Sequence, residues 1–319
     1  MGDAQFMKRL LLLTLLGAVI CLSGCGRGGD QDTAGRPTVA FVVKTLNNPF
    51  FVDMQNGARE AAERLNVNLI VQAAQRDTDS ERQMQIVENL IQTRPDALCI
   101  VPSGSKELLP AIAKANRAGI PVLVVDQGID EEAARESGVR TETYIGSPNY
   151  EGGRIAGRFL VEQSDGKAKV AILEGVPGQE AGIQRHEGFL NVLKDHPDME
   201  VVASQTAMFS RDQGFNVFQN MLTAHPEIEA LFATNDMMAL GAVEAIRAAG
   251  RTGTITVVGF DAVADAREAI REGTMLGSVA QYPAEMGRIA VESALKVING
   301  ESIPEYVPVE IDMFTKANL

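Results

Sequence analysis

Histidine, cysteine and tryptophan are scarce in this sequence. Its 319 residues include three histidines, three cysteines and no tryptophan. Three cysteines cannot build a disulfide scaffold, and the scattered histidines do not have the spacing of metal ligands, which excludes a zinc finger. We therefore expect neither a disulfide framework nor a metal site.

Basic residues are also few relative to acidic ones. Lys and Arg number 29 and Asp and Glu 42, which gives a formal net charge of −13. An acidic surface repels phosphate backbones, so we expect no nucleic-acid partner. Hydrophobic residues make up 45% and charged residues 22% of a chain long enough for two domains, which is a globular composition and excludes global disorder.

Motifs of catalytic and cofactor sites are missing as well. Gly166-Lys167-Ala168 lacks the upstream glycine and the hydroxyl residue of a Walker A motif, and the glycines of Gly152–Gly157 follow no G-x-G turn after a strand. No G-x-S-x-G sequence is present. Because nothing nominates a nucleophile, we expect no catalytic residue, no cofactor and no enzymatic activity.

The first 24 residues are typical of a signal peptide. Lys8 and Arg9 precede an apolar run from Leu10 to Leu22, which is short for a membrane span and fits the core of a secretory signal. The string Leu22-Ser23-Gly24-Cys25 resembles the lipobox of bacterial lipoproteins. That resemblance implies that Cys25 becomes the diacylated first residue of the mature chain. An ordinary signal peptide with an incidental cysteine is the alternative.

Residues 25–36 predict a flexible, lipid-anchored tether, because they are Gly-rich and polar. Translation starts either at Met1 or at Met7, which directly precedes the basic pair. After processing, only Cys25 and Cys99 remain, and Cys99 lies in an apolar run that predicts a buried strand. We therefore expect an exported, membrane-anchored protein without disulfides.

From Thr38 onward, short β-branched runs alternate with amphipathic stretches. Continuous apolar strands separated by helices are typical of parallel sheets covered on both faces. The predicted strands are Val39–Val43, Val67–Val71, Ala97–Val101, Pro121–Val125, Val170–Leu173, Val201–Ser204, Ala230–Ala233 and Ile255–Gly259. The predicted helices include Asn56–Leu65, Ser80–Thr93, Lys106–Ala118, Ser210–Ala224 and Asp236–Ala249.

The two halves of this alternation match each other. Thr93-Arg94-Pro95 precedes a strand as Ala224-His225-Pro226 does, and Asp126 and Asp261 end equivalent strands. A repeat of this length predicts two similar α/β domains. Ligands of open α/β sheets bind beyond the carboxyl ends of the strands, so we expect both carboxylates in one cleft. The alternative is that each aspartate only caps the following helix.

Two adjacent aromatic residues follow the first strand. Asn48 and Pro49 are typical of a helix cap and a first helical residue, and Phe50 and Phe51 come directly after them. Consecutive helical positions cannot share one buried face, so a helix start alone does not explain both rings. Rings beside amides and carboxylates suit a sugar, whose C–H faces stack while its hydroxyls need paired donors and acceptors.

Longer motifs carry a resemblance to a known family. They are Thr45–Phe51 (TLNNPFF), Asn220–Pro226 (NMLTAHP), Asn235–Ala242 (NDMMALGA) and Val257–Asp261 (VVGFD). With them the chain from Thr38 to about Val309 resembles bacterial periplasmic sugar-binding proteins of the ribose-binding type, whose fold is shared by the effector domains of the lactose repressor. The resemblance implies an α/β fold of two doubly wound parallel-sheet domains joined by three hinge crossovers, as in type I periplasmic binding proteins.

The same resemblance implies domain boundaries and hinges. The first domain would comprise residues 37–146 plus 282–305, and the second residues 147–281 plus 306–319. Hinges are expected near Gly146-Ser147, Gln281-Tyr282 and Glu305-Tyr306. A sugar that contacts both domains would favour the closed state.

Ligand contacts from both domains are implied as well. Several have a plain structural alternative: Asn235 could serve only as a helix cap, Phe209 as core and Arg185 as a solvated helix charge. The implied contacts are Lys44, Asn48, Phe50, Phe51, Asp126, Gln127, Arg185, Phe209, Asn235, Asp261 and Gln281.

Lys44 and Gln127 depart from the pattern of ribose binders, which carry a small hydroxyl residue and an arginine at these places. Val43–Leu46 together with Val52–Met54 is more similar to the allose-binding branch. We expect both side chains to face the ligand, although a lysine at the rim of the cleft could also point to water. The ligand therefore stays open between ribose and an allose-like hexopyranose.

These features together predict a solute-binding lipoprotein that captures a monosaccharide and delivers it to the permease and ATPase of an ABC importer. The alternative is a sugar sensor that uses the same cleft and presents its ligand to a chemoreceptor or sensor kinase. A secreted sugar-modifying enzyme is the third hypothesis. We expect a monomer in the periplasm or at the cell surface, held to a bacterial membrane by the lipid on Cys25.

Overall fold

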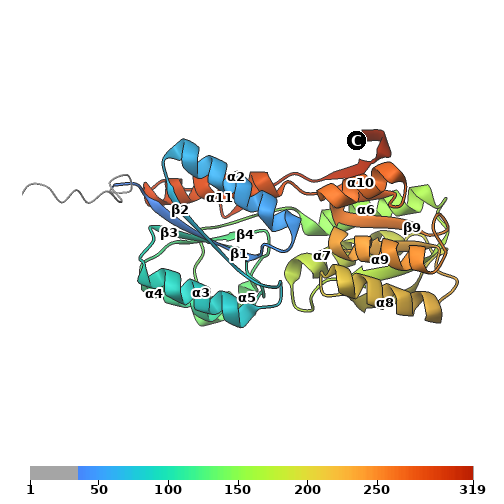
Figure 1. The fold of residues 1–319 in the computed structure, drawn as a ribbon. Helices are drawn as coiled ribbons and strands as arrows, with labels where there is room; N and C mark the ends of the chain where they lie inside the picture. The colour runs from blue at the N-terminus through green and yellow to red at the C-terminus, as the bar shows by residue number, and fades with distance from the viewer. Residues whose placement is uncertain (1–34, 319) are drawn as a thin grey trace, which may run out of the picture. The chain divides into compact units, whose positions relative to one another are not determined.

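Two six-stranded sheets organise the described part of the chain, which is residues 35–318 of a computed structural model (Figure 1). The predicted signal peptide, Cys25 and the tether before Gly35 lie outside these residues. Within residues 35–318, no helix is long and apolar enough to cross a membrane. The same part of the chain contains no cluster of three or more His, Cys, Asp or Glu side chains that could hold a metal ion.

The first sheet is parallel throughout and has the strand order β11-β5-β4-β3-β1-β2. Its strands are β1 (Thr38–Thr45), β2 (Asn68–Ala74), β3 (Ala97–Ile100), β4 (Val122–Val125), β5 (Thr143–Gly146) and β11 (Tyr306–Pro308). Its helices are α2 (Pro49–Leu65), α3 (Ser80–Gln92), α4 (Leu109–Arg117), α5 (Glu131–Ser137) and α11 (Pro283–Ile298). We call this sheet and its helices the first lobe.

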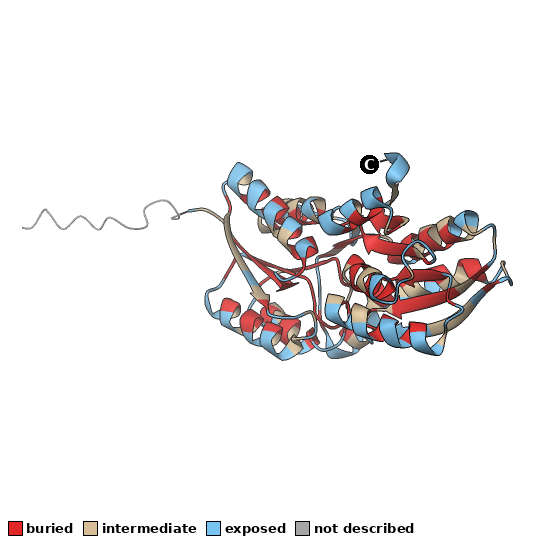
Figure 2. Cartoon of the chain, turned by 45° about the vertical axis from the view of Figure 1, so that its right-hand side comes forward, coloured by how far each residue is buried: buried red, intermediate tan, exposed pale blue. Residues whose placement is uncertain are grey.

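Both faces of the first sheet are buried, as the continuous apolar strands predict. Successive side chains of β1 alternate between the faces. Phe41 packs in the core under α2 and α11, whereas Ala40 and Val42 pack in a separate core under α3, α4 and α5. Figure 2 shows the result, with buried strands between helices whose outer sides are exposed. Because both faces are covered, only the strand ends are free to carry a site.

The second sheet has the order β12-β10-β9-β8-β6-β7, and its β12 edge strand is antiparallel to β10. Its strands are β6 (Ala168–Glu174), β7 (Met199–Thr206), β8 (Ala230–Ala233), β9 (Thr256–Asp261), β10 (Gly277–Ala280) and β12 (Asp312–Thr315). Its helices are α6 (Asn149–Gln163), α7 (Glu180–Leu193), α8 (Arg211–Ala224), α9 (Asp236–Ala248) and α10 (Ala264–Glu272), and the 3₁₀ turn η1 (Lys316–Asn318) follows β12. We call this sheet and its helices the second lobe. Helices α6 and α7 cover one of its faces, and α8, α9 and α10 the other.

The third crossover lies farther along the chain than the sequence predicted. The sequence predicts residues 306–308 in the second domain, but they form β11, which pairs in parallel with β5 of the first sheet. The ring of Tyr306 stacks on that of Tyr144, with 5.5 Å between the centroids. The chain therefore passes to the second lobe between Pro308 and Asp312, and not at Glu305-Tyr306.

Candidate ligand-binding site

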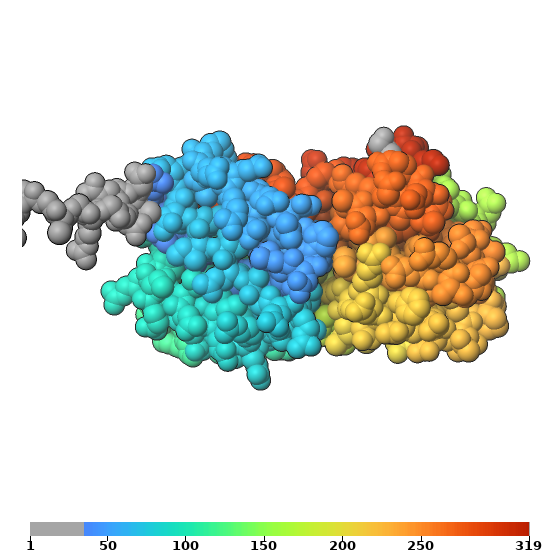
Figure 3. All heavy atoms as spheres, in the orientation of Figure 1, coloured from blue at the N-terminus to red at the C-terminus, as the bar shows by residue number. Residues whose placement is uncertain are grey.

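A cavity lies where the carboxyl ends of the two sheets face each other. It encloses about 310 Å³ of space free of protein atoms, its opening included. This is the edge at which open α/β sheets bind their ligands. In the space-filling view the start of α2, in blue, meets the yellow segment around the start of α8 (Figure 3). The lining residues are Lys44, Asn48, Phe50, Phe51, Asp77, Asp126, Ala181, Arg185, Phe209, Asn235, Asp261 and Gln281.

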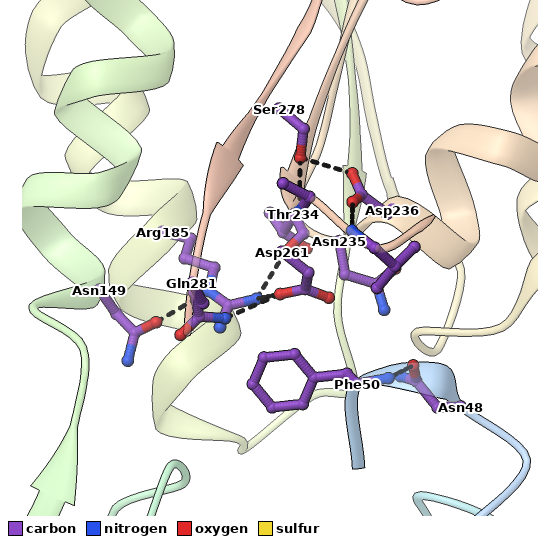
Figure 4. Close-up of polar contacts among 12 residues, drawn as sticks. Asn48, Phe50, Asn149, Arg185, Thr234, Asn235, Asp236, Asp261, Ser278 and Gln281 are labelled. Atoms are coloured by element: carbon purple, nitrogen blue, oxygen red, sulfur yellow. Dashed lines mark hydrogen bonds and ion pairs between the residues drawn. The ribbon is translucent and has the colours of Figure 1, made fainter. Parts of the chain in front are cut away.

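The wall from the first lobe contains the predicted aromatic pair. Asn48 is the N-cap of α2, and its Oδ1 accepts a hydrogen bond of 3.0 Å from the Phe50 amide (Figure 4). Pro49 fixes the first helical turn. Phe50 and Phe51 then pack edge to face, with their centroids 5.2 Å apart. The cap thus places two buried rings against the cavity.

The opposing ring from the second lobe is Phe209, in the loop before α8. Met208 and Phe209 both have positive φ, 58° and 54°, a conformation that costs non-glycine residues free energy. Gly175 leaves the room that the ring needs, because a Cβ there would lie 2.2 Å from Cζ of Phe209. The loop is therefore strained in a way that holds one aromatic face toward the cavity.

Four groups of the second lobe hold the Arg185 side chain. Its Nε donates to Oδ1 of Asn149 at 2.8 Å, and its Nη1 donates to the Thr234 carbonyl at 2.9 Å and to Oδ1 of Asp261 at 3.4 Å. The guanidinium also lies 3.9 Å from the centroid of the Phe260 ring. Within residues 35–318, its Nη2 has no protein acceptor, so a rigid donor remains for a ligand.

Asp261 is the carboxylate paired with Arg185, and it ends β9 as predicted. Its Oδ1 also accepts 2.7 Å from Nε2 of Gln281 (Figure 4). Burial raises the pKa of Asp261 to about 7, although Arg185 and Gln281 oppose that shift. Behind it, burial and the charge of Asp261 raise the pKa of Asp236, whose Oδ1 accepts from Ser278. Two buried carboxyl groups, Asp236 and Asp261, therefore lie beside a single cation, Arg185, in this part of the site.

Asp126 and Lys44 face the cavity from the first lobe. Asp126 has a φ of 60°, and the Tyr144 hydroxyl donates to its carbonyl at 2.8 Å, which fixes the turn after β4. Burial raises the pKa of the Asp126 carboxyl. Burial also lowers the pKa of Lys44, and the carboxylates of Asp126 and Asp77 oppose that shift. Nζ of Lys44 donates to Oε1 of Gln179 at 2.9 Å.

Gln127 is the one predicted contact that the structure does not bring to the cavity. The left-handed turn at Asp126 is closed by a 2.7 Å bond from the Gln127 amide to the Val125 carbonyl. It directs the Gln127 side chain into the first lobe, where Nε2 donates to Oγ of Ser105 and to the Gly128 carbonyl. The sequence could not show this reversal, because it depends on one backbone dihedral.

The other predicted contacts do line the cavity, and two residues were missed. Asn235 is both lining residue and helix cap, since its Oδ1 accepts from the Met238 amide at 3.0 Å. Asp77, in the loop after β2, and Ala181, in the first turn of α7, were not predicted. Asp77 follows a strand of the same sheet edge as Asp126, and that position was the only signal that could have found it.

Comparison with known proteins gives one matching family model and many relatives. The model is described as a periplasmic binding protein domain and matches residues 39–302. The ribose import binding protein RbsB of Escherichia coli (strain K12) is 39% identical over 90% of this chain and 93% of its own length. The D-allose-binding periplasmic protein of the same organism is 32% identical over 87% of this chain and 91% of its own.

A solved structure shows the same similarity. The periplasmic solute binding protein of an ABC transporter from Actinobacillus succinogenes 130z, crystallised with bound D-allose, is 39% identical and superposes with a TM-score of 0.83. The match covers 88% of this chain and 98% of that one. These relatives are described as binding proteins, and none of the three is described as an enzyme.

Proposed function

The chain belongs to the family of periplasmic binding proteins, and from this premise we propose that it binds one monosaccharide in the cavity between its lobes and delivers it to an ABC importer. One observation carries the proposal. Phe50 and Phe51 of the first lobe and Phe209 of the second line the same cavity, and Nζ of Lys44 lies 5.9 Å from the centroids of both the Phe51 and the Phe209 rings. A sugar ring is flat enough and apolar enough on its C–H faces to stack on these rings, with its hydroxyls near the ammonium.

The polar groups around this spot suit the edges of a sugar ring. Each sugar hydroxyl both donates and accepts, so a buried hydroxyl needs a partner of each kind. Asp126 and Asp261 supply acceptors, and Arg185 and Lys44 supply donors.

The choice between D-ribose and D-allose now rests on Lys44 alone, because Gln127 does not face the cavity. We propose that an aldohexopyranose such as D-allose competes with D-ribose, since the lysine reaches a hydroxyl that a pentose lacks. A site built to bond a particular hydroxyl strongly rejects analogues that lack this hydroxyl. One of the relatives is described as binding ribose and another as binding allose, so the similarity supports both sugars.

Calorimetric titration of the chain with D-allose, D-ribose and D-glucose tests this proposal. We expect D-allose to bind at least as tightly as D-ribose, and Lys44→Ser to shift the preference toward D-ribose. Tight binding of D-ribose by the unmutated chain with no response to any hexose would refute the specificity argument. No binding of any monosaccharide would refute the proposed function itself.

Domain closure and membrane attachment complete the proposal. We place the hinges at Gly146-Ser147, at Gln281-Tyr282 and, as the path of β11 requires, between Pro308 and Asp312. We also propose a lipid on Cys25, which would hold the chain at the membrane near the importer. Metabolic labelling with a fatty acid tests this, because Cys25→Ala should lose the label that the unmutated chain carries. Equal labelling of both would refute the anchor.

A further inference from the structure

Gln179 occupies the N-cap position of α7 but does not cap it. N-cap residues are usually Ser, Thr, Asp or Asn, whose short side chains bond the first free amides of the helix. The Gln179 side chain makes no such bond, and the residue is only 1% exposed. Its side chain leaves the second lobe and enters the first, so helix capping does not explain this glutamine.

Both atoms of the amide group are used in the first lobe. Oε1 accepts from Nζ of Lys44 at 2.9 Å, and Nε2 donates to the Ser103 carbonyl at 2.6 Å. The amide of the next residue, Glu180, donates to Oγ of Ser105 at 3.3 Å. A serine of the first lobe thus satisfies a free N–H at the start of a helix in the second lobe.

These bonds are the polar connection between the lobes. Within residues 35–318, every side-chain hydrogen bond that joins the lobes away from the three crossovers involves Gln179 or the Glu180 amide. The ion pairs of the same residues, Arg185–Asp261 among them, each lie within one lobe. The polar contact between the lobes therefore depends on one glutamine more than on any other side chain.

Lys44 connects this contact to the ligand site. A lysine carries its charge on a flexible four-carbon stem, so a fixed acceptor is needed to hold it in one place. We propose that Gln179 is a positioning residue: it holds the ammonium of Lys44 at the cavity and latches the closed lobes, and thereby sets the affinity for the sugar and the rate of its release. The effect on sugar rests on the proposed function, whereas the latch does not.

Gln179→Met tests the proposal, because methionine has a similar length and no hydrogen-bonding amide. Losing one neutral and one charge-assisted bond should weaken the binding of D-allose or D-ribose about 10- to 100-fold, mainly through faster release. Gln184→Met is the matched control. Gln184 lies on the same helix, but its amide bonds Glu180 within the second lobe, so affinity should change less than about twofold.

Two further measurements separate a latch from general damage. Hydrogen exchange of the sugar-free chain should become faster in the first-lobe loops of residues 76–80 and 101–106, while residues 183–193 of α7 stay unchanged. Combining Gln179→Met with Lys44→Met should cost less than the sum of the two single effects, because the two residues share a bond.

The three measurements test the latch, the positioning of Lys44 and the binding of sugar separately. Unchanged exchange in both loops would overturn the latch, whether or not any sugar binds. Additive effects of the Gln179 and Lys44 substitutions would overturn positioning through Lys44. If the unmutated chain binds no sugar, the proposed function fails, and the exchange data alone decide on the latch.

Discussion

Replacing Asp261 by asparagine should stabilise the sugar-free protein in a pH-dependent way. Burial raises the pKa of Asp261 to about 7, above its ordinary value of 3.8. The folded state therefore holds this proton more tightly than the unfolded state. The stability that this bound proton gives the unmutated chain is complete below the unfolded pKa and is lost as the pH rises toward 7. The asparagine variant does not suffer this loss. Asparagine keeps the shape and the oxygen that accepts from Gln281 and Arg185, but it has no proton to lose.

The size of the effect follows from the shift. About three pKa units at about 1.4 kcal/mol each give an upper limit of about 4 kcal/mol. The free energy of unfolding of Asp261→Asn, minus that of the unmutated chain, should therefore increase by up to about 4 kcal/mol between pH 4 and pH 8. Sugar binding should weaken at the same time, because the asparagine amide puts a donor where the ligand needs an acceptor. Stability and function would then move in opposite directions.

Urea denaturation at pH 4.5, 6 and 8 measures this difference. Phe218→Leu is the control, because it removes buried volume in the same lobe without changing any titrating group. Its cost should be about 1 kcal/mol and the same at each pH. If the gap between Asp261→Asn and the unmutated chain is also constant across this range, the reasoning about the buried carboxylate is wrong.

Two further variants test how the site is held in place. Arg185→Ala should reduce sugar affinity by more than about 100-fold, since it removes charge-assisted bonds, while circular dichroism shows a folded protein with a lowered melting temperature. Near-normal affinity would mean that the sugar binds elsewhere. Gly153→Ala should cost about 1–3 kcal/mol and weaken binding, because its Cβ would lie 2.0 Å from the Arg185 carbonyl and force α6 and α7 apart. Gly128→Ala is the control, because a Cβ at Gly128 would have no atom within 4 Å, and it should lower neither stability nor sugar affinity. Equal melting temperatures of the two glycine variants would contradict the packing argument.

Local sequence was sufficient for β1 to β4 and β6 to β9, whereas β5, β10, β11 and β12 were not among the predicted strands. The apolar runs became strands because alternating side chains of β1, such as Phe41 and Val42, fill cores on opposite faces. Asn48 and Asn235 became helix caps through bonds to amides two and three residues away. Strand ends of parallel sheets share one edge, so the position of Asp126 and Asp261 in the repeat was enough to predict that both face one cavity.

Only the tertiary structure decided which polar side chains surround that cavity and which strand closes each sheet. Gln127 turns away because of a single positive φ at Asp126, and Asp77 enters from a loop with no distinguishing motif. Gln179 reaches Lys44 across 135 residues of sequence, and β11 joins the first sheet beside β5 although 160 residues separate Tyr306 from Gly146. Such contacts depend on where distant segments meet, and the free energy that selects them comes from burial shared by both lobes, which no local pattern contains.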